Sequence, residues 1–348
     1  MNKVNDIYFS LDRFCQASFS TEPIKLTDKQ TDKQIEFKQI AEIRWPFKKN
    51  KIKLCCHPEM LIHFKHLSFD RKLDSFEKDV KLPIYKSHLQ KAIRRGKTES
   101  AIGTVNILFT MDPVTLLRRL PIIVLEDVFL YEEFPTLIWI MCYYSKNKEQ
   151  IDHFWQDYIR HLTKFLCEFA YRDPMPKHGI GFSSDDIPDD LSDQQRGLIY
   201  AIQVRKSYGG MKCDAEMLDR FSYKWTEVFS VPNRTSSIED LRHLSRNLSS
   251  ILLLQPKPII VPNYQLTMDN FILAGVDFHP CPDIIVYMMK KHPQYSKDFL
   301  KKLIWKHSSG INYRCLQPSV SKIWQEIEPT FIKATIKIRD KYLSEIIQ

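Results

Sequence analysis

The residues that come closest to a catalytic motif lie around Gly96-Lys97-Thr98, which matches the end of a phosphate-binding loop. That loop needs a glycine where this chain has Lys91, and it needs a preceding strand where this chain has the helical run KSHLQKAIRR. Gly179 and Gly181 lack the third glycine of a dinucleotide-binding turn, and no Gly-x-Ser-x-Gly nucleophile motif occurs. We therefore expect no nucleotide hydrolysis, and we identify no catalytic residue.

Cysteine and histidine cluster in the stretch CCHPEMLIHFKH, which begins at Cys55. A structural zinc site needs four ligands that converge at tetrahedral angles. Adjacent cysteines such as Cys55 and Cys56 point apart in a strand, no C-x-x-C pair is present, and the spacing of His63 and His66 equally fits a helix surface. We expect no metal site and no cofactor.

Two polar loops remain as candidate sites. Asp185, Asp186, Asp189 and Asp190 lie on a proline-containing stretch, where they either bind Mg²⁺ as nuclease carboxylates do or are simply solvated. The stretch HSSGINYR, which ends at Arg314, suits either a phosphate-contacting turn or the capped end of a helix.

Basic residues gather at 48–53, 91–97, 290–292 and 297–306. In RWPFKKNKIK, aromatic rings stand beside lysines, a mixture that suits single-stranded nucleic acid through base stacking and phosphate contact. Solvated helix faces carry such charges as well. The residues we assign to nucleic-acid binding, DNA rather than RNA, are Trp45, Lys48, Lys49, Lys51, Arg94, Arg95, Lys97 and Arg314.

The segment 87–128, SHLQKAIRRGKTESAIGTVNILFTMDPVTLLRRLPIIVLEDV, carries a recognisable order of motifs: Lys91, Ile93 and Arg94, then Ala101, Asp112-Pro113, Leu117-Arg118-Arg119-Leu120 and Glu126-Asp127. It resembles the C-terminal helical region of the MgsA/RarA group of clamp-loader-like AAA+ ATPases, although Phe129 stands where that family usually has glycine. In the family this region supports assembly beside a motor that acts at replication forks. The resemblance implies a helical packing unit and a role in DNA metabolism, without the ATPase motor.

Four charged residues of this segment have a spacing that favours ion pairs. Arg118 and Arg119 follow a capped turn, and Glu126 and Asp127 come two helical turns later. We expect these four residues to serve in an internal or intersubunit ion-pair network rather than in catalysis.

The elements that must position these residues are mainly helical. Nine glycines in 348 residues is about 2.6%, against a usual share of about 7%. That scarcity favours helices with short, proline-punctuated connections. The sequence predicts a mainly α multi-helix array with a small β-containing N-terminal segment.

The chain divides by pattern into four parts: an N-terminal segment with short strands over 1–56, a central helical array over 57–172, an acidic loop or linker over 173–193, and a C-terminal helical array over 194–348. Strand-like patterns occupy 35–43 and 51–56. Helical spacing predicts three helices within 82–131, then helices over 148–171, 194–208, 214–229, 237–254, 282–291, 296–306 and 320–347, the last kinked or divided at Pro329.

Charge and cysteine content bear on location. Fifty-one Lys and Arg against 42 Asp and Glu leave a net charge of +9, which favours a polyanionic partner. The N-terminus lacks the apolar core of a signal peptide, and no apolar run is long enough to span a bilayer. Eight scattered cysteines favour reduced thiols, so we expect an intracellular protein, cytoplasmic or nuclear, without a membrane partner.

Three function classes follow from these observations. The leading hypothesis is a non-catalytic accessory protein of DNA replication or metabolism that associates with nucleic acid, with a second copy or a replication protein as a further partner. Its lysine- and isoleucine-rich chain favours a viral source. The alternatives are a metal-dependent enzyme acting on nucleic acid through clustered carboxylates, and a helical protein–protein scaffold.

Overall fold

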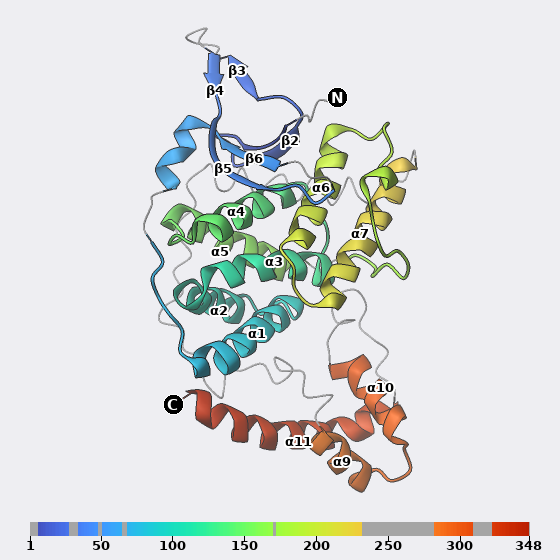
Figure 1. Cartoon of the computed structure of the whole chain (residues 1–348). Helices are drawn as coiled ribbons and strands as arrows, with labels where there is room; N and C mark the ends of the chain where they lie inside the picture. The colour runs from blue at the N-terminus through green and yellow to red at the C-terminus, as the bar shows by residue number, and fades with distance from the viewer. Residues whose placement is uncertain are drawn as a thin grey trace.

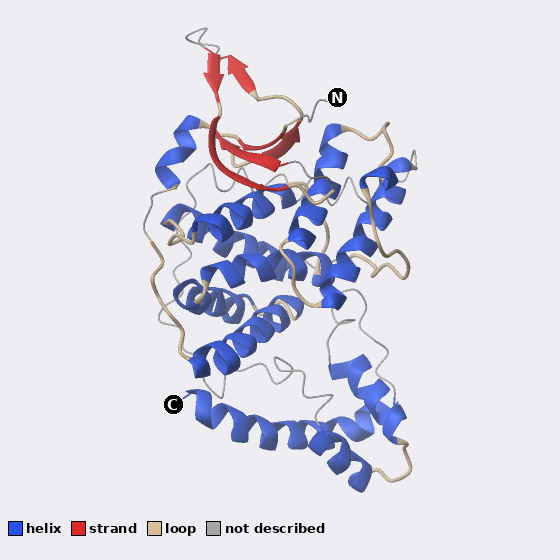
Figure 2. Ribbon diagram, in the orientation of Figure 1, coloured by secondary structure: helices blue, strands red, loops and turns tan. Residues whose placement is uncertain are grey.

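The computed structural model describes residues 6–27, 34–47, 51–64, 68–169, 172–231, 282–308 and 322–347. Helices dominate it, and the strands are confined to the N-terminal part (Figures 1 and 2). The mainly α fold with a small N-terminal β segment, which the sequence predicts, is confirmed.

The N-terminal strands form a mixed sheet in the order β2-β1-β6-β5, in which β1 runs parallel to β6 and the other neighbours are antiparallel. Apolar and polar residues alternate along β1, so that Phe9 and Leu11 face the helices beneath the sheet. The bounds are β1 (Ile7–Leu11), β2 (Ala17–Ser20), β5 (Lys38–Arg44) and β6 (Lys51–Cys56), with a separate ribbon of β3 (Lys25–Thr27) and β4 (Gln34–Glu36).

Five helices follow after the 3₁₀ helix η1 (Pro58–His63) and the π-helical turn η2 (Glu77–Lys81). They are α1 (Leu82–Arg94), α2 (Thr98–Met111), α3 (Pro113–Asp127), α4 (Phe134–Asn147) and α5 (His153–Glu168). Gly96, at φ +64°, ends α1 in a Schellman motif, with the Lys97 N–H donating to the Ala92 carbonyl. Asp112 caps α3 by accepting from the Thr115 N–H at 2.9 Å. The glycine at 96 thus ends a helix and starts no phosphate loop.

Two further helices complete the main body: α6 (Asp193–Ser207), which opens on a Ser192/Gln195 capping box, and α7 (Lys212–Ser230). One hydrophobic cluster joins the sheet, α1 to α5, α6 and α7, so it continues on both sides of residues 173–193. Its largest fully buried side chains include Trp139 and Trp155. The short η3 turn (Ser184–Asp186) lies on the connecting stretch.

The C-terminal helices have a hydrophobic cluster of their own, which includes Ile284, Leu300 and Trp324. These helices are α9 (Pro282–Lys291), α10 (Lys297–Ser308) and α11 (Lys322–Ile347), drawn below the main body in Figure 1. The helix α11 continues through Pro329 and is not divided there. The helix expected over 237–254 lies outside the described residues. Among the helices that are described, none is long and apolar enough to cross a bilayer.

Candidate nucleic-acid interface and buried polar network

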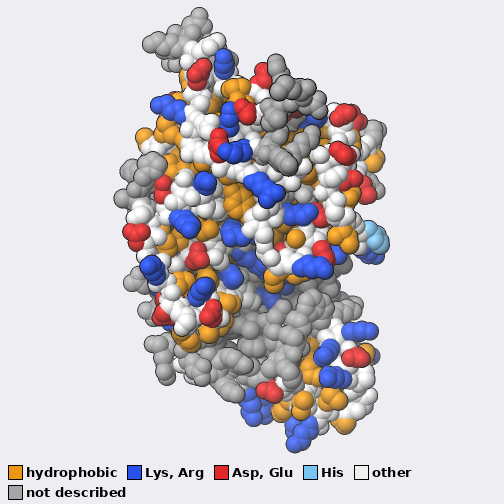
Figure 3. Space-filling view, in the orientation of Figure 1, with side chains coloured by type: hydrophobic (Ala, Val, Ile, Leu, Met, Phe, Trp, Pro, Cys, Tyr) orange, Lys and Arg blue, Asp and Glu red, His pale blue; other side chains and the backbone are white. Residues whose placement is uncertain are grey.

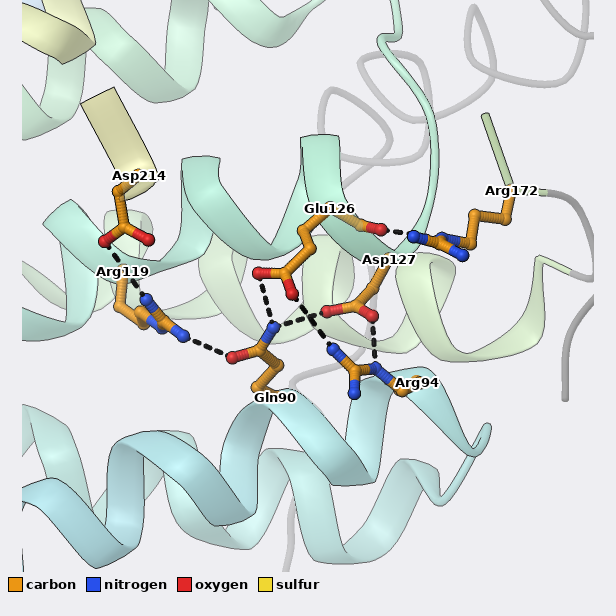
Figure 4. A network of polar contacts seen from close by, with 7 residues as sticks. All are labelled: Gln90, Arg94, Arg119, Glu126, Asp127, Arg172 and Asp214. Atoms are coloured by element: carbon orange, nitrogen blue, oxygen red, sulfur yellow. Dashed lines mark hydrogen bonds and ion pairs between the residues drawn. The ribbon is translucent and has the colours of Figure 1, made fainter. Parts of the chain in front are cut away.

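The charged residues of α1 and α3 meet in a buried network (Figure 4). The Arg94 guanidinium of α1 donates from Nε to Asp127, which is 0% exposed, and from a terminal nitrogen to Glu126 at 3.3 Å. Arg94 itself is buried, so the pair is shielded from solvent. A charge-assisted pair of this kind holds two helices in one register, and its disruption leaves an uncompensated charge in the core.

Gln90 extends the network from its centre. Its side-chain nitrogen donates to Glu126 at 2.8 Å and to Asp127 at 2.7 Å, while its oxygen accepts from Arg119. Arg119 in turn contacts Asp214, near the start of α7, at 3.5 Å. The network therefore connects α1, α3 and α7 (Figure 4).

The electrostatics of the network centre on Glu126. Burial raises the pKa of Glu126 and the adjacent Asp127 raises it further, whereas Arg94 opposes the shift. The carboxylates of Glu126 and Asp127 both accept hydrogen bonds from side chains of the protein, which suits a structural role. Of the four residues expected in ion pairs, Glu126 and Asp127 pair with Arg94 of α1 rather than with an arginine of α3, and Arg119 pairs with Asp214. Arg118 forms no ion pair with a described residue and donates to a backbone carbonyl instead.

Arg118 lies at a second junction. It donates to the carbonyl of Tyr208 at the end of α6, and Arg205 returns a hydrogen bond to the Arg118 carbonyl at 2.8 Å. Burial lowers the pKa of Arg205 to about 10, and repulsion from Arg118 contributes. Arg118 thus joins α3 to the α6–α7 turn.

Two residues assigned to nucleic acid from the sequence are placed in the interior instead. Trp45, which directly follows β5, is 4% exposed and packs edge-on against Tyr200 of α6, with ring centroids 4.9 Å apart. Arg94 is engaged by Asp127 and Glu126. The assignment of Trp45 and Arg94 to nucleic-acid binding is therefore wrong, because both side chains are buried. Lys48, Lys49 and Arg314 lie outside the described residues.

The remaining assigned residues are on or near the surface and belong to different elements. Lys51 begins β6, is exposed, and pairs with Glu42 at 2.9 Å. Arg95 and Lys97 flank the glycine that ends α1, with Lys97 exposed and Arg95 partly buried. Lys51 thus belongs to the sheet, whereas Arg95 and Lys97 lie between α1 and α2.

The aspartates of the acidic stretch do not gather into a metal site with Glu126 and Asp127. Asp185 is exposed, and Asp186 caps its own turn by accepting from the Ser183 N–H at 2.7 Å. Within the described ranges, no group of three Asp, Glu, His or Cys side chains is arranged to hold a metal ion. The carboxylate constellation that a metal-dependent nuclease requires is therefore not assembled by these residues.

The cysteine–histidine stretch is also explained by packing. Cys55 and Cys56 are buried, and burial raises the pKa of the Cys56 thiol to about 12. His57 caps η1, while His63 stacks on Phe154 at 4.1 Å. His66 lies outside the described residues.

An exposed basic surface lies on α9 and α10. Residues 282–308 contain six lysines and two aspartates, with no arginine or glutamate. Five of the lysines are exposed and form no ion pair with any described residue: Lys290, Lys291, Lys297, Lys301 and Lys302. Figure 3 shows Lys and Arg side chains gathered over this unit at the lower right.

An aromatic ring stands among these lysines. Phe299 is 38% exposed and lies stacked on Tyr295 at 5.3 Å. The hydroxyl of Tyr295 donates to Glu326 of α11 at 3.2 Å, which fixes the ring beneath Phe299. The sequence marks 290–292 and 297–306 as basic stretches, but none of their residues is among those assigned to nucleic-acid binding from the sequence. The sequence signal that identifies them is Phe299 between Lys297 and Lys301.

Comparison of the chain with protein-family models, with curated proteins and with solved structures found no match.

Proposed function

We propose that this chain is a non-catalytic accessory protein that binds single-stranded nucleic acid, DNA in the first instance, through α9 and α10. The observation that carries the proposal is the combination of exposed, unpaired lysines with an exposed, supported aromatic ring on one small helical unit. Lysines supply the phosphate contacts that dominate nucleic-acid affinity. Rings such as Phe299 supply stacking that tolerates any base.

Some exposed lysines of the main body are partly compensated, since Lys51 and Lys164 each have a carboxylate within 4 Å. Others, such as Lys72 and Lys97, have no such partner among the described residues but belong to separate segments, whereas the lysines of α9 and α10 share one small unit with an exposed ring. The lysines of α9 and α10 are free to release counterions on binding a phosphate backbone.

The unit that carries these residues is held in shape by its own packing. Leu300 and Ile304 of α10 face inward to the cluster with Trp324, which directs Lys297 and Lys301 outward. The α9–α10 turn is pinned to α11, because His292 contacts Thr330 at 3.0 Å and Gln294 donates to Glu326 at 3.1 Å. Lysines and ring therefore keep a fixed spacing.

A purely protein–protein scaffold is the alternative for this surface, since Val286, Met289 and Ile332 are also exposed here. Lysines flank these apolar side chains, and such a mixture favours a polyanion that stacks. The role in DNA metabolism and the assembly function implied by the clamp-loader-like segment remain part of this proposal, with the α1–α3 network as a rigid packing unit.

The test uses the full chain and a fluorescein-labelled 20-nucleotide single strand of mixed sequence, with anisotropy read at about 0.1 M salt. Replacing Lys297, Lys301 and Lys302 with Gln should weaken binding roughly 100-fold if each lysine neutralises one phosphate. The matched control removes three exposed main-body charges: Lys72→Gln, Lys78→Gln and Lys164→Gln.

The control variant should bind within about twofold of the parent chain. Equal losses in both variants would mean a diffuse charge effect, and they would refute the assignment to α10. Phe299→Leu should cost about 1–3 kcal/mol of binding free energy at unchanged charge, and an unchanged affinity would remove the stacking part of the proposal.

A further inference from the structure

A cavity of about 620 Å³ lies where the sheet meets the N-terminal ends of α4 and α6. Its walls include Ala17, Ser18 and Phe19 of β2, Thr136 of α4 and Gly197 of α6. The volume lies within the range of sites that bind small molecules or short peptide segments. None of these walls belongs to the α9–α10 surface.

One wall of the cavity is the edge of a sheet. β2 is an outer strand in the order β2-β1-β6-β5, and it pairs only with β1 among the described strands. The Ala17 N–H donates to Thr136 Oγ1 at 3.0 Å, so this group points away from β1. Because successive residues of a strand alternate, the N–H and C=O of Phe19 point the same way, toward the cavity that Phe19 lines. The Ala17 N–H is thus already engaged, and the backbone of Phe19 is the part of this edge that can pair with an added strand.

The charge of the cavity is opposite to that of the chain. Four carboxylates line it, those of Asp12, Glu132, Glu133 and Asp193. No lysine or arginine is among the described residues of its walls. The chain as a whole carries +9. Glu133 directly precedes α4, and Asp193 is the first residue of α6. The site therefore favours a cation and repels a nucleic acid.

A polar side chain inside the cavity adds an independent observation. Ser10 is 1% exposed, lines the cavity, and has no nitrogen or oxygen partner for its hydroxyl among the described residues. Its neighbour across the β1–β6 ladder is the thiol of Cys55, a weak hydrogen-bonding group. A ligand with a polar group at this depth would satisfy the hydroxyl.

We propose that the β2 edge and this cavity bind an extended, lysine- or arginine-rich segment of a partner protein by strand addition. The backbone of the segment pairs with Phe19, and alternate side chains reach the carboxylates on one side and the rings of Phe19 and Phe37 on the other. This surface is separate from α10, so the chain would bridge a basic protein and a nucleic acid.

The probe is a fluorescein-labelled eight-residue peptide of alternating lysine and valine, titrated against the full chain by anisotropy. We expect saturable binding, no binding of the alternating glutamate and valine peptide, and loss of binding when every second backbone nitrogen of the basic peptide is methylated. Unchanged affinity of the methylated peptide would overturn strand addition, as would spermine binding as tightly as the peptide.

Variants locate the site. Glu132→Gln with Asp193→Asn should weaken peptide binding about tenfold, whereas Asp189→Asn with Asp190→Asn, an equal charge change on the exposed acidic stretch, should change it less than about twofold. Peptide binding should also slow hydrogen exchange of the Phe19 amide. Equal effects of the two double variants, or exchange at Phe19 that the peptide leaves unchanged, would contradict the proposal.

Discussion

Replacing Arg94 with Met tests whether the α1–α3 network stabilises the fold. Methionine keeps most of the apolar stem of the side chain and removes the guanidinium, so packing changes little while the partner of Asp127 and Glu126 is lost. Gln90 remains as a donor to both carboxylates, but it brings no charge. The variant therefore isolates the ionic part of the network.

The expected loss is large because Asp127 is 0% exposed. Breaking a buried ion pair by removing one partner costs about 3–5 kcal/mol of unfolding free energy. For a domain of this size that corresponds to a fall in melting temperature of roughly 6–20 °C. Arg71→Met is the matched control, since Arg71 pairs with Glu77 at 2.7 Å on the surface and should contribute less than about 1 kcal/mol.

Thermal unfolding followed by tryptophan fluorescence reports on the main cluster, which contains Trp45, Trp139, Trp155 and Trp225. The loss should also depend on pH. Glu126 has a raised pKa, so the folded chain binds more protons than the unfolded chain above the ordinary carboxyl pKa, and stability falls as pH rises through that interval. Without Arg94 the pKa of Glu126 rises further, so the destabilisation should be greater at pH 8 than at pH 5.

A double-mutant cycle completes this test. Arg94→Met combined with Asp127→Asn should be less destabilising than the sum of the two single changes by about 1–3 kcal/mol. The reasoning is refuted if the coupling is zero within error, or if Arg94→Met costs no more than Arg71→Met.

Two further predictions concern positions whose geometry is distinctive. Gly96→Ala should lower the free energy of unfolding by about 1–2 kcal/mol or more, because φ is +64° and the new Cβ would lie 3.1 Å from the Cys167 carbonyl oxygen. Gly181→Ala should cost less, because Gly181 also has a positive φ but has open space around it. Urea unfolding of both variants measures the difference. Alkylation of the native chain at pH 7.5 should modify the exposed Cys213 well before Cys142, because burial raises the pKa of the Cys142 thiol to about 12. Peptide mass spectra measure the two rates, and labelling of Cys142 at a similar rate would contradict its burial.

The sequence predicted the helices best where punctuation was strong. Asp112-Pro113 and Gly96 mark helix ends that the structure reproduces, because capping and left-handed glycine act within a few residues. The strands β1 and β2 were not foreseen. Their short runs become strands by pairing, and the parallel contact of β1 with β6 joins residues more than 40 positions apart, which local pattern cannot reveal.

The candidate site was predicted less well, for reasons that lie in tertiary structure. Trp45 and Arg94 have the residue types of a nucleic-acid site, but their burial is decided by α6 and α3. Asp214 was expected to begin a helix; α7 begins at Lys212, and Asp214 contacts Arg119 instead. Phe299 among lysines was visible in the sequence, but its exposure and its support by Tyr295 were not.

The slope of binding affinity against salt tests the central claim most directly. The labelled single strand should bind the parent chain with log K falling linearly with log salt concentration, and the slope should become shallower by about 2 when Lys297, Lys301 and Lys302 are replaced with Gln. Phe299→Leu should lower affinity at every salt concentration without changing the slope. A parent chain whose affinity is flat between 0.05 and 0.2 M salt, or a triple variant with the parental slope, would contradict phosphate binding by α10.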